Sequence, residues 1–600
     1  MTAENADHAT QVTHRYRVRV LPQLHVLDIT LTLVARPEQE KVRLALPTWV
    51  PGAYAFMRYG RDLSLPEVVL RDGGEKLQVR RDGWQGFVVD GVRGPIDIQY
   101  RVHAYDPAWG ELTGFVGDNQ AIVLGPRYLF SPDAPGQVEV QFETPAGWPL
   151  HVAGLASGSG QGPWTFQSLP ALFDTPVVLG AFERVTVPVE GVPFHFVFMD
   201  RAPGFDRQVQ GLVDDFVRVA QACHAVFGSF PFAHYTFVCT FNPESHWGLE
   251  HRASTMVSLG QHALIDANVR RSAIRLAAHE LFHAWNVCRL QPAPLGQVDV
   301  VNGSFPDALW VSEGFTRYYE FLLATRTRGI PPDVFFSNVV KFYRHLEAMP
   351  AYARVTPKDA SLSTFLNHHK YPGSINNAID YYDHGMLVAF DLEVALRTSR
   401  EPSTLDQTFR AFFDAYAGKG HGFSTADFRD FLAERHGEDI ARIVDDEVET
   451  AGGLRVPESL EALGFELERE PVHFLGLVLE ENTGPELVNV LDTSPAGMAG
   501  LAAGDVLLEV NEFPFELRVL RYFVDHESEV RLTVRRGALR RTYSVPVARR
   551  ERISGLVWRG RPEQLERVRN WLTLPELAWT VGERLPLGAF DNFHGIQSIL

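Results

Sequence analysis

Residues 278–286 read AHELFHAWN, so two histidines stand four positions apart and a glutamate directly follows the first. On a helix, residues i and i+4 lie one turn above each other on the same face, so His279 and His283 can reach one cation. Glu280 is rotated by about 100° from His279, which lets its carboxylate miss the metal and act on the attacking water. The spacing therefore predicts a helical zinc site with its own general base.

A catalytic zinc site needs three protein ligands and one open position. The next helical pattern reads LWVSEGFTRYYE over residues 309–320, and Glu313 stands thirty positions after His283. That distance leaves room for a loop and a returning helix, so we expect Glu313 to complete a His–His–Glu set for one Zn²⁺ per chain. Glu320, two turns further on, is the alternative ligand. An ordinary first-turn carboxylate, favoured by the helix dipole, is the competing interpretation of Glu313.

The organisation of the 600-residue chain predicts a multidomain α+β protein, since about 150 residues per domain allow two to four domains. Apolar residues alternate with polar ones over 1–190, which favours a β-sandwich-like domain. Long helical patterns dominate from Val269 to about His436, within the expected catalytic domain over 191–460, and short strand patterns return in the expected PDZ-like domain over 465–550. A helix and a tail are expected over 551–600. The clearest individual patterns are helices over 206–227, 270–285, 308–326, 386–398, 425–435 and 562–572, and a strand over 235–240.

The composition excludes several classes of protein. Lys and Arg number 56 against 74 Asp and Glu, and a net charge of −18 would repel nucleic-acid phosphates. A membrane-spanning helix needs about 18 consecutive apolar residues, and every apolar run in this sequence is far shorter. The polar N-terminus has no signal-peptide pattern. Cys223, Cys239 and Cys288 form no CxxC motif, so a reducing cytoplasm is the expected location.

The runs HELFHAWN from His279 and WVSEGFTRYYE from Trp310 resemble the glycyl aminopeptidase family of zinc metallopeptidases, which are thermolysin-like enzymes of the His–His–Glu, or gluzincin, type. The run LPTWVPGAY over 46–54 is similar to that family's N-terminal β domain. The family also carries a PDZ domain, which matches residues 471–547. This resemblance covers almost the whole chain and implies a thermolysin-like catalytic domain followed by a PDZ-like β domain.

Carried over position by position, the family's zinc ligands fall on three residues and its general base on a fourth. They are His279, His283, Glu313 and Glu280. These are the residues to which the spacing also points.

The run WGLEHR over 247–252 is similar to the family's Gly-Gly-Leu-Glu-His-Arg segment and, through it, to the exopeptidase motif of alanyl aminopeptidases. There the segment is an edge strand beside the zinc, and its glutamate binds the substrate's α-amine. The resemblance implies substrate-binding roles for Gly248 and Glu250. The chain departs from the family at Trp247, where glycine is usual, and we expect the bulkier ring to narrow the substrate cleft.

The run YYDHG over 381–385 resembles the Tyr-x-Lys-Gly motif, whose tyrosine hydroxyl supports the tetrahedral intermediate. The resemblance places Tyr382 in that catalytic role. His384 stands where lysine is common, and Tyr381 is the alternative if the register shifts by one. A buried aromatic residue is the competing interpretation of either tyrosine.

In the PDZ-like segment, the run FLGL resembles a carboxylate-binding loop whose backbone N–H groups hold a peptide C-terminus. This implies peptide-binding roles for Phe474, Leu475, Gly476 and Leu477, against the alternative of a scaffold that binds nothing. The chain itself ends in QSIL at 597–600, a pattern that PDZ domains bind, so the tail is a candidate ligand of this loop. Alternatively, its apolar residues anchor it elsewhere on the protein.

Together these features predict a zinc-dependent aminopeptidase acting on peptides with a free N-terminus. The resemblance implies a preference for releasing small residues, Gly or Ala. Two other functions stay open, namely a thermolysin-type endopeptidase and a catalytically weak protein that binds peptides through its PDZ-like domain. Neither nucleic acid nor a membrane is an expected partner.

Overall fold

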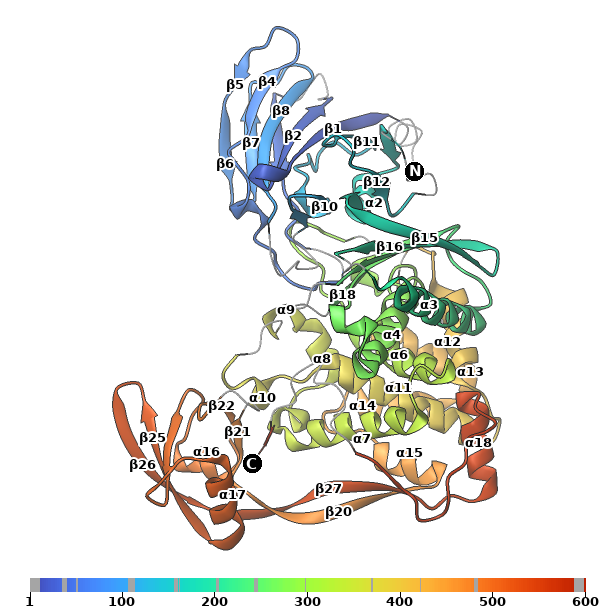
Figure 1. The fold of residues 1–600 in the computed structure, drawn as a ribbon, viewed down its shortest axis with the longest axis vertical. Coiled ribbons are helices and arrows are strands. Elements are labelled where there is room, and N and C mark those ends of the chain that lie inside the picture. Colours follow the sequence, from blue (N-terminus) through green and yellow to red (C-terminus); the bar gives the residue numbers. More distant parts are fainter. Residues whose placement is uncertain are drawn as a thin grey trace. The chain divides into compact units, whose positions relative to one another are not determined.

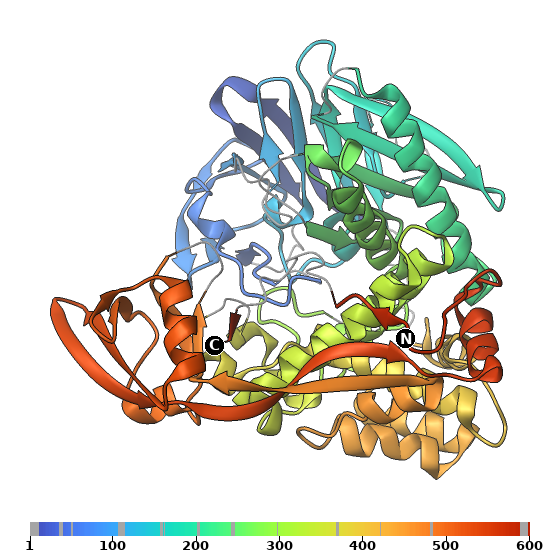
Figure 2. The same cartoon turned by 60° about the horizontal axis from the view of Figure 1, so that its bottom comes forward.

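The computed structural model describes residues 11–34, 40–49, 52–105, 114–155, 160, 162–200, 204–241, 247–296, 298–367, 371–420, 422–479, 484–587 and 598–599. The chain forms two compact units (Figures 1 and 2). The first unit holds residues 1–289 and 294–304, and the second holds residues 290–293 and 305–600. The prediction of a β-rich N-terminal part followed by a helical region is confirmed. The bounds of the four predicted domains stay a prediction.

The N-terminal part of the first unit consists of three sheets, with strand orders β13-β11-β1-β2-β8-β4-β5, β12-β14-β10-β9 and β3-β7-β6. Strand β2 shows why these residues form a sheet, because every second side chain from Leu27 to Leu33 is buried and the others are half-buried. The elements are β1 (Val12–Leu21), β2 (Val26–Leu33), β3 (Lys41–Ala45), β4 (Glu67–Leu70), β5 (Lys76–Leu77), β6 (Val79–Asp82), β7 (Gly86–Asp90), β8 (Ile96–His103), β9 (Phe115–Val116), β10 (Gln120–Val123), β11 (Gln137–Glu143), β12 (Leu150–Val152), β13 (Trp164–Phe166), α2 (Leu169–Phe173) and β14 (Val177–Gly180).

The rest of the first unit is a five-stranded sheet in the order β15-β16-β17-β19-β18, with two long helices. Strands β16, β17 and β19 are parallel, whereas β18 pairs antiparallel with β19 and ends the sheet. Helix α4 contacts α3, β18 and β19. The elements are β15 (Phe182–Val189), β16 (Val192–Met199), α3 (Asp206–Phe227), β17 (Tyr235–Thr240), β18 (Trp247–Glu250), β19 (Ser254–Ser258) and α4 (Ala267–Phe282). The predicted helix over 206–227 and strand over 235–240 are both confirmed.

Helix α4 ends three residues before the predicted end. It starts after Asp266, whose side chain accepts hydrogen bonds from the N–H groups of Asn268 and Val269 at 2.8 and 3.0 Å. It ends at Phe282 because the following backbone tightens, and the N–H of Trp285 bonds to the carbonyl of Phe282 at 3.0 Å. His283 still has helical backbone angles of −59° and −21°, so the predicted one-turn spacing from His279 is kept.

The helical part of the second unit is arranged around α11 (Tyr381–Thr398), whose residues Met386–Phe390 are completely buried. Helix α11 contacts α5, α6, α7, α12, α14 and α15. The other helices are α5 (Leu309–Ser312), α6 (Gly314–Arg326), α7 (Pro332–Ala348), α8 (Pro357–Leu362), α9 (Thr364–Asn367), α10 (Ser374–Asn377), α12 (Leu405–Tyr416), α13 (Thr425–His436), α14 (Glu438–Glu447) and α15 (Val456–Leu463). Within the described ranges, no helix combines the length and apolar character needed to cross a membrane.

The helix predicted over 308–326 is split in two at Glu313, which separates α5 from α6. At this point α6 and α11 touch backbone to backbone. A Cβ atom added to Gly314 would lie 2.4 Å from the Cα of Gly385, and one added to Gly385 would lie 2.2 Å from the carbonyl oxygen of Trp310. Only glycine fits at either position, and the contact brings the start of α6 beside the first turns of α11.

The C-terminal part of the second unit contains a long antiparallel ribbon that carries a smaller module. Strands β20 (Phe465–Phe474) and β27 (Ala548–Trp558) pair along their whole length, with Phe474 opposite Ala548. Between them, residues 475–547 form what we call the C-terminal module, which has its own apolar core. Its elements are β21 (Leu477–Leu479), β22 (Leu487–Val490), α16 (Pro495–Ala499), β23 (Val506–Val510), β24 (Phe513–Pro514), α17 (Leu517–His526), β25 (Glu529–Arg536) and β26 (Leu539–Pro546).

The C-terminal module is joined to the helical part at α10 by polar contacts. The Asn376 side chain donates to the carbonyl of Val490 at 2.9 Å and accepts from the N–H of Asp492 at 3.1 Å. Arg354 forms an ion pair with Asp492 at 2.6 Å. The module therefore contacts the segment that leads directly into α11.

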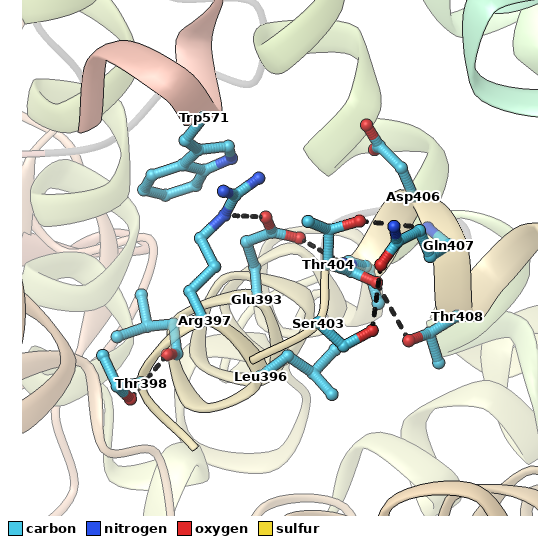
Figure 3. A network of polar contacts seen from close by, with 12 residues as sticks. Glu393, Leu396, Arg397, Thr398, Ser403, Thr404, Asp406, Gln407, Thr408 and Trp571 are labelled. Atoms are coloured by element: carbon cyan, nitrogen blue, oxygen red, sulfur yellow. Dashed lines mark hydrogen bonds and ion pairs between the residues drawn. The ribbon is translucent and has the colours of Figure 1, made fainter. Parts of the chain in front are cut away.

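After the ribbon, the chain returns to the helical part through α18 (Pro562–Leu572), which has the predicted bounds. Short strands β28 (Arg584–Leu585) and β29 (Ser598–Ile599) follow. A buried polar network lies beside the end of α11 (Figure 3). Glu393 forms an ion pair with Arg397 and accepts the N–H of Leu405, the first residue of α12, at 2.7 Å. The Arg397 guanidinium lies 5.7 Å from the ring centroid of Trp571 in α18, so the network connects residues of three helices.

Replacing Glu393 with alanine is therefore expected to destabilise the second unit. The change strands the Arg397 guanidinium and the Leu405 N–H, and breaking a buried ion pair costs about 3–5 kcal/mol of the free energy of unfolding. Denaturant unfolding followed by far-UV circular dichroism measures the effect. Glu401→Ala, at an exposed site on the following loop, is the matched control and should stay within about 0.5 kcal/mol of the unsubstituted protein. Equal midpoints for Glu393→Ala and this control would contradict the prediction.

Candidate metal centre and active site

The two predicted histidine ligands converge at the end of α4. Their Nε2 atoms lie 3.0 Å apart, and the Nδ1 of His283 lies 2.7 Å from the carbonyl oxygen of Asn286. Because a carbonyl can only accept, the proton of neutral His283 must be on Nδ1, which leaves an Nε2 lone pair directed at His279. Two imidazole nitrogens held this way fit a shared divalent cation. Sequence reasoning missed Asn286, because its backbone carbonyl carries the interaction.

The predicted general base, Glu280, is buried beside the edge strand β18. A Cβ atom added to Gly248 would lie 2.1 Å from Glu280 Oε1, so the absence of a side chain at Gly248 makes room for this carboxylate. Glu250, Glu280 and His283 each offer a ligand atom, and these atoms lie within 4.8 Å of one another. The first unit thus brings together two carboxylates and an imidazole, which suits proton transfer and recognition of a cationic group.

The side chains of strand β18 alternate between the two faces of the sheet. Since Gly248 faces Glu280, strand alternation places Glu250 on the same face and Trp247 with Leu249 on the opposite one. Leu249 is buried in the core of the N-terminal sheets, and Trp247 packs against the same core. The expectation that the Trp247 ring narrows the substrate side is therefore wrong, because the ring serves as packing on the far face of the sheet.

In the second unit, the structure places Glu313 beside the first turn of α11. Glu313 is buried, and its charge adds to burial in raising the pKa of Tyr381. The Tyr381 hydroxyl accepts a hydrogen bond from the Thr364 hydroxyl at 2.9 Å and is buried, whereas Tyr382 is only half-buried. This difference favours Tyr382 over Tyr381 as the tyrosine that can meet a substrate. The alternative ligand, Glu320, is half-buried in α6, two turns beyond Glu313.

A buried ion pair fixes the start of α11 against α6. Arg317 lies 3.2 Å from the carboxylate of Asp383, and its guanidinium is also 5.7 Å from the ring centroid of Tyr382. Burial raises the pKa of Asp383 to about 7, and the Arg317 charge opposes that shift. Sequence reasoning missed this pair, although a charged residue inside each of two apolar helical runs was an available signal.

His384 does not replace the lysine that it was compared with. It is completely buried, its ring lies 5.7 Å from that of Tyr352, and burial lowers its pKa to about 3. A neutral imidazole packed against Tyr352 carries no charge at neutral pH. The cation next to Tyr382 is instead Arg317, from the neighbouring helix.

Comparisons with known proteins agree with this arrangement. The model of the M61 glycyl aminopeptidase family matches residues 272–388, and the model of the M61 peptidase N-terminal domain matches residues 15–181. The first match spans the segments that hold His279, His283, Glu313 and Tyr382. These matches support a peptidase activity. No curated protein matches the chain.

Solved structures with a similar fold include the crystal structure of an aminopeptidase N family protein from Idiomarina loihiensis. It is 19% identical with a TM-score of 0.83, over 93% of this chain and all of that one. Yeast LTA4 hydrolase in complex with bestatin is 16% identical with a TM-score of 0.47, over 74% of this chain and 68% of that one. The first of these matches shows that the fold described above is shared over nearly the whole chain.

Gly248→Ala is expected to impair hydrolysis, because the added methyl group would occupy the space of the Glu280 carboxylate. A displacement of about 1 Å in a reacting group can lower turnover by about 10²-fold. The matched control is Gly94→Ala, since nothing lies within 4 Å of a Cβ atom at that position. Peptide hydrolysis and bound metal would be measured for both variants. Unchanged hydrolysis in Gly248→Ala would show that Glu280 does not need this space.

Proposed function

The chain belongs to the M61 glycyl aminopeptidase family, and we propose that it is a zinc-dependent aminopeptidase that hydrolyses the first peptide bond of peptides with a free N-terminus. The observation that carries the proposal is the pair of imidazole nitrogens 3.0 Å apart, one with its tautomer fixed by Asn286. This pair lies next to a buried carboxylate that can act as a base. The same features argue against a catalytically inert peptide binder.

The proposed ligand set is His279, His283 and Glu313. Two imidazoles and one carboxylate are a common donor set for catalytic zinc. Further support comes from the family model, which spans all three positions in one match. When bound, zinc supplies Lewis-acid activation of water and of the scissile carbonyl.

In the proposed reaction, Glu280 removes a proton from the attacking water through its carboxylate and later delivers that proton to the departing amine. Burial next to Gly248 keeps this carboxylate close to His283. The Tyr382 hydroxyl donates a hydrogen bond to the carbonyl oxygen as negative charge develops on it. Arg317, which lies against the Tyr382 ring, is a positioning residue for that tyrosine.

Glu250 is proposed to bind the substrate's α-ammonium group. It lies on the same face of β18 as Gly248, and its carboxylate is within 4.8 Å of ligand atoms of Glu280 and His283. An ammonium held there would bring the first peptide bond, rather than a later one, to Glu280. The family's preference suggests Gly or Ala as the released residue, and a cytoplasmic location remains a prediction from the sequence.

The main test combines metal content with one conservative variant. We expect about one zinc per chain, loss of hydrolysis of amino-acyl chromogenic substrates on chelation, and recovery when zinc is restored. Glu280→Gln should keep the zinc and lower turnover by about 10²–10⁴-fold, because the amide cannot accept the proton. His279→Ala is the contrasting variant and should lose the metal. Hydrolysis that persists after exhaustive chelation would refute the zinc proposal, and near-normal turnover of zinc-loaded Glu280→Gln would refute the base assignment.

A second test addresses the exopeptidase assignment. Glu250→Ala removes the partner of the α-ammonium group, a loss worth about 2 kcal/mol or more, so kcat/KM on free N-termini should fall at least about 30-fold. Bound zinc should be unchanged, and Glu67→Ala, at an exposed position on β4, is the matched control. The unsubstituted enzyme should reject N-acetylated peptides. Efficient cleavage of acetylated peptides, with the same ratio in Glu250→Ala, would favour the endopeptidase alternative.

A further inference from the structure

Strand β21 of the C-terminal module is the middle strand of a three-stranded sheet, so it is paired on both sides. On one side, β21 pairs antiparallel with β22, with Leu477 opposite Val490. On the other side it pairs antiparallel with β29, the last strand of the chain. Figure 1 shows β29, at the red end of the colour bar, beside β21. More than a hundred residues separate the two strands in sequence, so the tail has returned to the module as an added strand.

The direction of β29 is set by its register. Ser598 lies opposite Leu479 and Ile599 lies opposite Val478, so the chain runs along β21 toward the start of that strand. The loop that precedes β21 connects Phe474, the last residue of β20, to Leu477. The tail therefore runs toward this loop. Its final residue, Leu600, lies outside the described residues.

The backbone of the loop before β21 is only partly engaged by other described residues. The carbonyl oxygens of Leu475 and Gly476 accept hydrogen bonds from the N–H groups of Ala496 and Leu491, each at 2.9 Å. Between described residues, no hydrogen bond involves the N–H groups of Leu475 and Gly476. Gly476 has a φ of +86°, a left-handed conformation that turns successive N–H groups of a loop in a common direction.

A positive charge stands beside the same loop. The Arg550 guanidinium lies 4.1 Å from the ring centroid of Phe474, and its Nε atom is buried without a hydrogen-bond partner among the described residues. Free N–H groups together with a cation suit a carboxylate. Strand addition next to such a loop is the mode by which PDZ domains bind the C-termini of other proteins.

We propose that β21 and residues Phe474–Leu477 form a binding site for an extended peptide C-terminus, and that the chain's own tail occupies this site in cis. The backbone of β29 supplies the strand pairing, and the N–H groups of Leu475 and Gly476 form the part of the site that would bind the terminal carboxylate of a peptide. The tail is thus an intramolecular competitor for any outside peptide. This inference concerns a second site and does not depend on the proposed hydrolysis.

The consequence is measurable because a tethered ligand acts at a high effective concentration. A tether of this kind typically gives an effective concentration near the millimolar range. An outside peptide of the same sequence, with a dissociation constant of about 10 μM, would then bind the intact chain about 100-fold more weakly than a chain without the tail. Removing the tail should therefore raise the affinity rather than abolish binding.

The test uses the full chain as purified and two variants. One variant ends after Gln597, and the other carries Ser598→Gly together with Ile599→Gly, which keeps the length of the tail but weakens the strand. The probe is a decapeptide with the sequence of residues 591–600, DNFHGIQSIL, with fluorescein on its α-amine. That blocked amine also protects the probe from an aminopeptidase. Fluorescence anisotropy gives the dissociation constant for each protein, and the same peptide with an amidated C-terminus tests the need for a carboxylate.

We expect the truncated chain to bind the probe at least tenfold more tightly than the intact chain, the double-glycine variant to bind with intermediate affinity, and the amidated probe to bind weakly. Equal affinity in all three proteins, or no binding by the truncated chain, would overturn the proposal. Light scattering of the intact and truncated chains provides an independent check. An oligomer that dissociates on truncation would show that the tail docks on another chain, which also contradicts occupation in cis.

Discussion

The backbone contact between α6 and α11 is the constraint on which the second unit depends. Where Gly314 meets Gly385, the two helices approach more closely than any side chain allows, and the residues on either side of the contact are fixed by it. Glu313 precedes one glycine, and Tyr382 precedes the other by less than a turn. The ion pair between Arg317 and Asp383 flanks the same crossing and is excluded from water. A site assembled around such a contact needs little reorganisation to hold its side chains, which is the condition for electrostatic catalysis.

In the first unit, a short turn after α4 fixes a side chain of the site. Helix α4 ends just before His283, and the carbonyl of Asn286 in the turn that follows lies at hydrogen-bond distance from the His283 imidazole. A regular helix would keep that carbonyl within its own ladder of hydrogen bonds, so the early end of the helix lets the carbonyl orient the His283 imidazole. The edge strand β18 contributes through a missing side chain, because the space beside Gly248 is occupied by the Glu280 carboxylate. Both features concern one or two residues, and both affect the orientation of side chains in the HExxH motif.

Much of this was predictable from the sequence where a periodic pattern was strong. The bounds of α3, β17 and α18 follow from apolar spacing, and the metal-binding pattern of α4 follows from the two histidines alone. The break at Glu313 was not predicted, although Gly314 beside it has low helix propensity, because the close contact with α11 at this point is not visible in the local sequence. The pairing of Arg317 with Asp383 and the direction of Trp247 depend on which elements become neighbours. Local sequence does not tell which elements become neighbours, whereas a resemblance to a family of known fold tells this in part.

The way in which the C-terminal module is attached has a consequence for how the chain is assembled. Phe474 lies opposite Ala548, so the polypeptide leaves the β20–β27 ribbon and re-enters it at adjacent positions. In topological terms, the 73 residues between them form an insertion at the tip of a β-hairpin, with a core separate from that of the helices. Such an arrangement lets a whole domain be gained, lost or exchanged without changing the register of the ribbon that carries it. The ribbon is thus the part of the C-terminal region that follows directly from the helices, and the module is an insertion within it.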